Sequence, residues 1–278
     1  MTTAPWTEGV AFGPGVPKPD PILVIDSLVR RFGGLVAVDV DHLEVQRGSI
    51  TALIGPNGAG KTSLFNLVTG FDRPNSGRWT FDGADLTGWS ADRVASAGMV
   101  RTFQLTKVLG RMSVLDNMLV GAKGQRGEAM LAAALAWLWR DADRANFVRA
   151  RQLLEDFRLS AVERDYAATL SGGQRKLLEM ARALMAEPNV IMLDEPMSGV
   201  NPALVQSLLG HIIELRAQGM TVVFVEHDMD VVMGISDWVV CMAEGRIISE
   251  GPPSVVGADP VVIDAYLGTH TADQGGDP

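Results

Sequence analysis

The amino-acid sequence predicts an α/β fold, with a mainly parallel core sheet flanked by helices. Continuous apolar runs of four to six residues alternate along the chain with segments of helical composition. Strands that are apolar on both faces are typical of a parallel sheet covered by helices. One of these runs, residues 49–54, leads through a glycine-rich turn directly into a helical segment, as a strand–helix–strand unit requires.

The expected elements follow in chain order. Strands are expected where apolar and β-branched residues cluster between turn residues, at residues 22–25, 49–54, 78–81, 190–193 and 221–225. Helices are expected where Ala, Leu, Arg and Glu dominate, at residues 63–69 and 202–218 and over most of residues 91–182. A closing β-hairpin is expected at residues 238–242 and 246–249.

The ends of the chain differ from the segment between them. Residues 1–21 contain five prolines and no apolar stretch of signal-peptide length, so we expect a flexible tail there. One domain then spans residues 22–270, and residues 271–278 form a second tail. The longest central apolar run, residues 129–139, has 11 residues, whereas a membrane-spanning helix needs about 20. We therefore expect a cytoplasmic protein that reaches a membrane only through partners.

Charge and cysteine content exclude some classes of function. The chain has 33 acidic and 24 basic residues, a net charge of −9, and proteins that bind nucleic acid over their surface usually have the opposite balance. We therefore expect no nucleic-acid partner. The single cysteine, Cys241, lies in an apolar run. It excludes a disulfide within the chain and is expected to be a small buried hydrophobic residue.

Residues 55–62 match the phosphate-binding pattern G-x-x-x-x-G-K-[ST] at every defined position. The glycines let successive backbone N–H groups point into one concavity, and the next helix adds the positive end of its dipole. Lys61 would supply charge to the β- and γ-phosphates, and Thr62 a hydroxyl to Mg²⁺. We expect a nucleoside triphosphate site formed by Gly55, Pro56, Asn57, Gly58, Ala59, Gly60, Lys61, Thr62 and Ser63.

Two adjacent carboxylates, Asp194 and Glu195, follow the apolar run at residues 190–193. Ligands of parallel sheets bind beyond the carboxyl ends of the strands, and a triphosphate site needs a metal-binding carboxylate and a group that orients the attacking water. We assign Asp194 to Mg²⁺, through water, and Glu195 to the attacking water as general base. Without the phosphate loop, such a pair would more often cap a helix.

The segment Leu-Ser-Gly-Gly-Gln precedes this strand, and with the phosphate loop it makes the chain resemble the ATP-binding cassette (ABC) family over residues 22–268. The resemblance implies a P-loop NTPase of the ABC type, with an antiparallel β subdomain and an α-helical signature subdomain at about residues 91–182. It also implies a dimer, because in the family the signature faces the γ-phosphate held by a second subunit. The signature residues are Leu170, Ser171, Gly172, Gly173 and Gln174.

The resemblance implies roles for further residues. Phe32 stands where the family stacks an aromatic ring on adenine, the alternative being a core phenylalanine. Gln104 matches the glutamine that senses Mg²⁺ and the γ-phosphate, so that Thr62, Gln104 and Asp194 form the metal set. His227 matches the switch histidine that contacts the γ-phosphate, and joins Glu195 and Gln104 as catalytic residues. The dimer-contacting loop is matched by Ser198, Gly199, Val200 and Asn201.

Within the family, the chain resembles the ATP-binding subunits of branched-chain amino-acid importers, notably in Arg-Thr-Phe-Gln at residues 101–104 and Ala-Tyr-Leu-Gly at residues 265–268. Urea importers and lipopolysaccharide-export ATPases resemble it in the same places and stay open as alternatives. A cassette protein that acts on DNA or ribosomes is the alternative from another class. Such proteins carry coiled-coil insertions, zinc-binding cysteines or a second cassette, which this sequence lacks.

A transport role implies partners on the inner face of the cell membrane. These are a second ATPase subunit, identical or paralogous, transmembrane permease subunits and a solute-binding protein that acts through the permease. The permease contact is expected directly after Gln104, at Leu105, Val108, Leu109 and Met112, and packing inside the helical lobe is the alternative. Residues 128–156, with Trp137 and Trp139, carry no motif; we favour a packed helix over a partner-binding one.

Overall fold

The computed structural model describes residues 5–102, 108–123 and 140–272. Its larger sheet has six strands in the order β10-β9-β3-β8-β7-β6. All neighbours pair in parallel except the hairpin β9–β10. The strands are β3 (Ile50–Ile54), β6 (Met99–Arg101), β7 (Val190–Asp194), β8 (Thr221–Val225), β9 (Trp238–Ala243) and β10 (Arg246–Gly251). The predicted mainly parallel core sheet is therefore confirmed.

The smaller sheet is antiparallel throughout, in the order β2-β1-β4-β5. Its strands are β1 (Pro21–Phe32), β2 (Leu35–Gln46), β4 (Ser76–Phe81) and β5 (Ala84–Asp85). Of these strands, the sequence predicted β4 at residues 78–81 and the first residues of β1, but not β2. The reason is physical: most of their length mixes buried and exposed side chains, as in a half-solvated sheet, and the apolar runs at residues 22–25 and 35–38 cover only the start of each strand.

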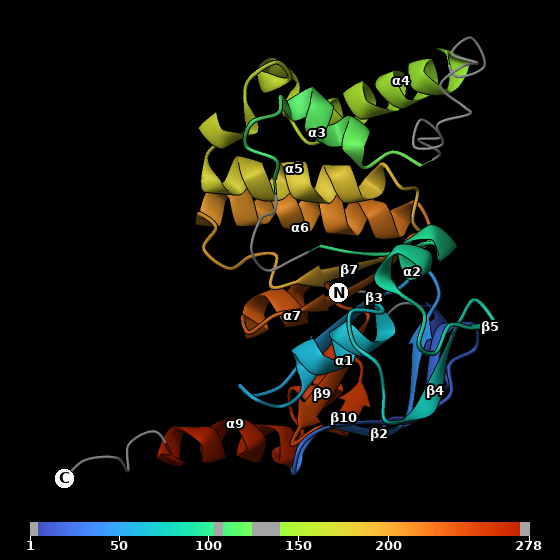
Figure 1. The fold of residues 1–278 in the computed structure, drawn as a ribbon. Coiled ribbons are helices and arrows are strands. Elements are labelled where there is room, and N and C mark those ends of the chain that lie inside the picture. The colour runs from blue at the N-terminus through green and yellow to red at the C-terminus, as the bar shows by residue number, and fades with distance from the viewer. Residues whose placement is uncertain (1–4, 103–107, 124–139, 273–278) are drawn as a thin grey trace.

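The helices form two groups (Figure 1). One group forms a lobe above β7 in this view, with α3 (Val114–Val120), α4 (Arg140–Asp156) and α5 (Gly172–Leu184). The other lies around the sheets, with α1 (Lys61–Val68), α2 (Ala91–Ala97), α6 (Pro202–Ala217), α7 (Met229–Ile235), α8 (Pro253–Val256) and α9 (Pro260–Ala272). Among the described residues between 91 and 182, helices predominate as predicted, although the segment opens with α2 and the short edge strand β6, which lie together at the larger sheet.

Both faces of the six-stranded sheet are buried. Along β8, Val222 and Phe224 belong to one hydrophobic cluster, whereas Val223 and Val225 belong to the other. Cys241 on β9 is fully buried, as predicted. Burial raises the pKa of its thiol to about 12, so the residue is chemically inert at neutral pH.

The prediction of a flexible tail over residues 1–21 is wrong for the described part, residues 5–21. Trp6 packs on Trp238 with ring centroids 5.4 Å apart. Lys18 forms a buried ion pair with Glu250 at 3.1 Å. Glu250 also accepts hydrogen bonds from the Gly15 amide at 2.6 Å and the Trp238 indole at 2.8 Å. The segment is ordered because a buried carboxylate on β10 needs these partners.

In the part of the chain that the structure describes, no helix is long and apolar enough to cross a bilayer. Predictions for Gln104, Leu105, Trp137, Trp139 and the tail after residue 272 lie outside the described residues.

Candidate functional site

The phosphate loop joins the end of β3 to α1 and lies against neighbouring backbone. Gly55 has φ 145° and Gly60 has φ 100°, angles that favour glycine. A Cβ on Gly55 would overlap the carbonyl oxygen of Met242 on β9, and a Cβ on Gly60 would overlap that of Ala37 on β2. Two strands therefore fix the shape of the loop, and both positions require glycine.

Lys61 is the first residue of α1, and its side chain turns back into the loop. Its Nζ donates to the carbonyl oxygens of Gly55 at 2.6 Å and Pro56 at 2.9 Å. An ammonium group has three donors, so one remains for a ligand in the loop. Burial lowers the pKa of Lys61, and the negative charges of Glu195 and Asp194 oppose this shift. The lysine is thus held at the base of the loop, where phosphates would bind.

A hollow of about 650 Å³ opens in front of the loop. Its lining unites predicted residues from four distant parts of the chain: Phe32, Asn57 to Ser63, Glu195 and His227. Phe32 is 49% exposed, and the Arg30 guanidinium lies 4.4 Å from its ring centroid. The alternative that Phe32 is a core residue is therefore wrong, and the ring is accessible at the wall of the hollow.

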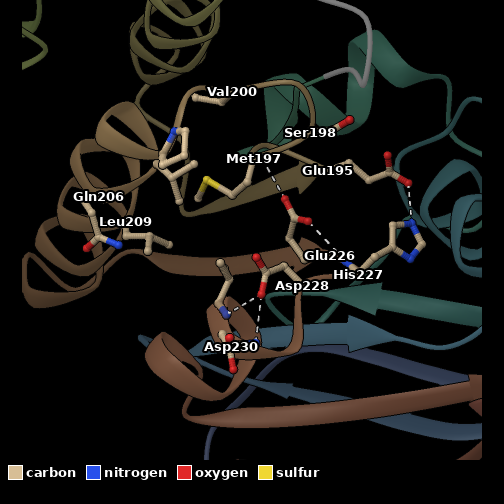
Figure 2. A pocket seen from close by; sticks show the side chains of 13 residues that line it. Glu195, Met197, Ser198, Val200, Gln206, Leu209, Glu226, His227, Asp228 and Asp230 are labelled. Atoms are coloured by element: carbon tan, nitrogen blue, oxygen red, sulfur yellow. Dashed lines mark hydrogen bonds and ion pairs between the residues drawn. The ribbon is translucent and has the colours of Figure 1, made fainter.

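Glu195 and His227 meet across the ends of β7 and β8 (Figure 2). Glu195 Oε1 lies 2.8 Å from His227 Nε2. The Glu195 backbone has φ 48°, a strained conformation for this residue, and its amide donates to the Val225 carbonyl at 3.0 Å. This turn aims the carboxylate at the histidine, so the two side chains predicted to act in catalysis lie in contact.

The residue before His227 holds the surrounding loops together. Glu226 is buried and accepts hydrogen bonds from the amides of Met197 at 2.7 Å and His227 at 3.3 Å. Burial raises the pKa of Glu226 above its ordinary value, against the effect of these two hydrogen bonds. Asp228 caps α7 by accepting from the amides of Asp230 and Val231. The histidine therefore extends from a fixed turn (Figure 2).

Asp194 ends β7 but does not line the 650 Å³ hollow. Its carboxylate Oδ2 accepts from Arg101 on β6 at 2.6 Å, and both side chains are 5% exposed. Arg101 also donates to Asn66 Oδ1 on α1 at 2.6 Å. The structure thus places the predicted metal carboxylate outside the lining of the hollow, with one oxygen engaged by an arginine.

The signature residues begin α5, away from this hollow. Ser171 accepts from the Gln174 amide, and the Gln174 side chain accepts from the Ser171 amide, which forms a capping box. Among the described residues that line the hollow, none belongs to residues 170–174. Ser171 and Gly172 are exposed, whereas Leu170 is buried, so one chain presents these two signature residues to solvent rather than to its own phosphate loop.

The predicted dimer loop lies beside Glu195, on the rim of a second hollow of about 590 Å³ (Figure 2). Ser198, Gly199 and Asn201 are exposed, and Val200 is half-buried. Lys176, on the first turns of α5, donates to the carbonyl oxygens of Glu195 at 3.1 Å, Pro196 at 3.0 Å and Ser198 at 2.6 Å. The helix that carries the signature is therefore tied to this loop within the chain.

Three residues of the site have contacts that the sequence did not predict. Arg101 stands in the Arg-Thr-Phe-Gln stretch, Lys176 two residues after the signature, and Tyr266 in the closing Ala-Tyr-Leu-Gly stretch. Tyr266 accepts a hydrogen bond from the Gly55 amide at 2.8 Å. All three stand within or beside quoted motifs, and this position was the only signal that could have marked them.

Two family models match the chain. A model described as "ABC transporter" matches residues 38–198, and one described as "Branched-chain amino acid ATP-binding cassette transporter" matches residues 246–272. The first covers both the phosphate loop and the signature. The second covers β10 and α9.

The chain is also similar to curated ATP-binding proteins of transporters and to solved structures of ATP-binding cassettes. The chain is 38% identical over 250 residues to the high-affinity branched-chain amino acid transport ATP-binding proteins BraF of Pseudomonas aeruginosa and LivG of Escherichia coli K12, covering 89% of this chain and 98% of each relative. A crystal structure of the ADP conformation of an ATP-binding cassette of an ABC transporter matches with TM-score 0.78 and 37% identity, covering 89% of this chain and 99% of that one. The chain therefore belongs to the ABC transporter family, as one of its ATP-hydrolysing cassettes.

Proposed function

We propose that this chain is the ATPase subunit of an importer for branched-chain amino acids. The proposal rests on one observation above all: the phosphate loop, Phe32, Glu195 and His227 line a single hollow. A hollow of about 650 Å³ lies in the range of small-ligand sites, about 300–1,000 Å³. The names of the relatives at 38% identity supply the amino-acid class.

In the proposed complex, the triphosphate lies in the loop and adenine stacks on Phe32. Backbone N–H groups of the loop and the remaining Lys61 donor would hold the phosphates. Stacking suits an aromatic ring that is half exposed at the wall of the hollow. Glu195 would take a proton from the attacking water as general base, and His227, 2.8 Å away, would hold that carboxylate and contact the γ-phosphate.

The residues near the loop fit a Mg²⁺ ion held mainly by phosphates. Among the described residues, no group of three His, Cys, Asp or Glu side chains could hold a metal by itself, and Mg²⁺ in phosphate sites uses only one or two protein ligands and water. The Thr62 hydroxyl would bind it directly and Asp194 through water, since one oxygen of Asp194 is engaged by Arg101. Bound there, Mg²⁺ would neutralise charge on the phosphates. The third predicted metal residue, Gln104, lies outside the described residues.

We propose that hydrolysis requires a second cassette subunit. The exposed residues Ser171 and Gly172 at the start of α5 present a helix N-terminus that suits a γ-phosphate bound by the partner. Ser198, Gly199, Val200 and Asn201 would contact the partner beside the catalytic turn. The membrane partners would be permease subunits with a solute-binding protein, and the cassette would then lie on the inner face of the cell membrane. Leu109, which is 42% exposed, is the contact we propose for the permease.

Two substitutions test this function in the purified chain. Glu195→Gln preserves size but cannot accept the proton, so ATP turnover should fall by about 10²–10⁴-fold while ATP still binds. Lys61→Ala should weaken ATP binding itself, because its charge acts in both ground and transition states. The matched control is Glu155→Gln, an exposed glutamate on α4. Parental turnover in Glu195→Gln, or unchanged ATP affinity in Lys61→Ala by titration, would contradict these roles.

A further inference from the structure

The C-terminal helix contacts the phosphate loop directly. Helix α9 follows the β9–β10 hairpin and begins beside it, then extends away from the sheets (Figure 1). From this helix Tyr266 reaches the first residue of the loop, and its hydroxyl oxygen accepts a hydrogen bond from the Gly55 amide at 2.8 Å. The two residues are 211 positions apart in the sequence. The closing Ala-Tyr-Leu-Gly stretch thus has a partner inside the nucleotide site.

Both backbone polar groups of Gly55 form hydrogen bonds with side chains. Its N–H donates to Tyr266 at 2.8 Å, and its carbonyl accepts from Lys61 Nζ at 2.6 Å. No larger residue fits here, because a Cβ would overlap the Met242 carbonyl. Elements α9, α1 and β9 therefore meet at one residue: the tyrosine accepts from its amide, and the phosphate-binding lysine donates to its carbonyl oxygen.

This amide needs a partner that regular structure does not supply. Gly55 stands after the last residue of β3 and is buried, and its N–H donates to a side-chain oxygen rather than to a neighbouring strand. A buried amide without a partner is costly. Burial raises the pKa of the Tyr266 phenol to about 12, so the hydroxyl stays neutral around pH 7 and its lone pairs can accept the bond. The Tyr266 hydroxyl can therefore accept the hydrogen bond of the Gly55 amide throughout the physiological pH range.

We infer that Tyr266 is a positioning residue for nucleotide binding, through which helix α9 fixes Gly55 and, with it, Lys61. This inference rests on the proposed role of the loop in binding phosphates. Because Tyr266 acts on the loop before the reaction, it should favour ATP, ADP and the transition state alike. Loss of such uniform binding raises KM and leaves kcat unchanged. A residue that merely stabilised the fold would not produce that separation.

The test is Tyr266→Phe in the full chain, which removes only the hydroxyl. The dissociation constants of a fluorescent ATP analogue and of ADP should both rise by about tenfold, equal to about 1.4 kcal/mol. The KM for ATP should rise by a similar factor and kcat should stay within about twofold. Hydrogen exchange at the Gly55 amide should accelerate. Unchanged affinity for both nucleotides would overturn the inference.

Two control variants on α9 separate positioning from general stability. Leu267→Ala changes an exposed side chain, 59% accessible, and should leave affinity unchanged. Val262→Ala opens a small cavity at a residue that is 3% exposed but keeps the hydroxyl. It should lower the melting temperature without weakening nucleotide binding. If Val262→Ala weakens binding as much as Tyr266→Phe, the tyrosine acts through helix stability and the inference fails.

Two further results complete the design. If Tyr266→Phe does not fold, hydrogen exchange in the parent protein still tests the hydrogen bond between Gly55 and Tyr266. The Gly55 amide should be protected from exchange to the same extent as the amides of α9. Much faster exchange at Gly55 would refute the hydrogen bond. Lys61→Ala separates this inference from the proposed function. If Lys61→Ala binds nucleotide normally, the site assignment itself is wrong. If Lys61→Ala fails to bind while Tyr266→Phe binds normally, only the role of Tyr266 is wrong.

Discussion

Replacement of Arg101 by Met should destabilise the protein far more than loss of an ordinary surface charge. Arg101 and Asp194 are each 5% exposed, and their 2.6 Å contact is buried. Met fills a similar volume but leaves the Asp194 carboxylate without its cation. Breaking a buried pair from one side costs about 3–5 kcal/mol, whereas an exposed pair contributes about 1 kcal/mol or less. We therefore expect a loss of about 3–5 kcal/mol in the free energy of unfolding.

The assay is equilibrium urea unfolding, followed by tryptophan fluorescence, of a double-mutant cycle. The cycle comprises the parent, Arg101→Met, Asp194→Asn and the double variant. Since Asp194→Asn removes the buried charge that Arg101→Met leaves unpaired, the double variant should lose less stability than the sum of the single losses, by about 2–3 kcal/mol. The surface control is Arg246→Met. Arg246 pairs with Asp39 at 2.6 Å, and its side chain is 70% exposed.

Two results would refute this reasoning. One is that Arg101→Met lowers the free energy of unfolding by no more than Arg246→Met does, which would mean that water reaches the Asp194 carboxylate. The other is additivity of the two single changes, which would mean that the two groups do not interact. Arg101→Lys should restore only part of the stability, because an ammonium cannot reproduce the planar fork that reaches both Asp194 and Asn66.

Two further predictions concern the partners. Gly172→Leu should leave folding and ATP binding intact, because a Cβ there meets open space, but it should block hydrolysis. Mixtures of Gly172→Leu subunits with Lys61→Ala subunits should regain ATP hydrolysis. Failure of every mixture to do so would count against action of the signature across a dimer. The control is Gly173→Leu, where a Cβ would overlap Leu204 and stability should fall. Leu109→Glu should keep the fold and ATP affinity while permease copurification and transport fall; unaffected transport would place the contact elsewhere, and unfolding would make Leu109 a core residue.

The parts of the site that the sequence predicted are those coded by consecutive residues. The phosphate loop is one unbroken pattern, and Asp194 and Glu195 follow a recognisable strand, so their positions follow from local chemistry. Their contacts do not. Arg101 meets Asp194 from 93 residues away, and neither residue marks the other in the sequence. Local periodicity reports which face a residue occupies, but not which side chain it meets there.

The N-terminal segment shows the opposite failure, in which composition was a misleading guide. Prolines and the lack of periodicity predicted a flexible tail, because neither favours helix or strand. What orders the segment is Glu250, which is 1% exposed on β10 and draws in Lys18, Gly15 and Trp238. A buried carboxylate 232 residues away from Lys18 cannot be recognised from local composition.

Lys176 joins the helix that carries the signature to the turn that carries Glu195 within one chain. The turn after β7 runs through the positive-φ residue Glu195, which removes its carbonyl oxygens from the sheet ladder. Lys176 supplies donors to three of them, at Glu195, Pro196 and Ser198. Burial lowers the pKa of this lysine, and nearby glutamates, Glu226 foremost, oppose the shift. As long as these contacts hold, α5 cannot shift toward a partner without displacing the turn that aims Glu195 at His227.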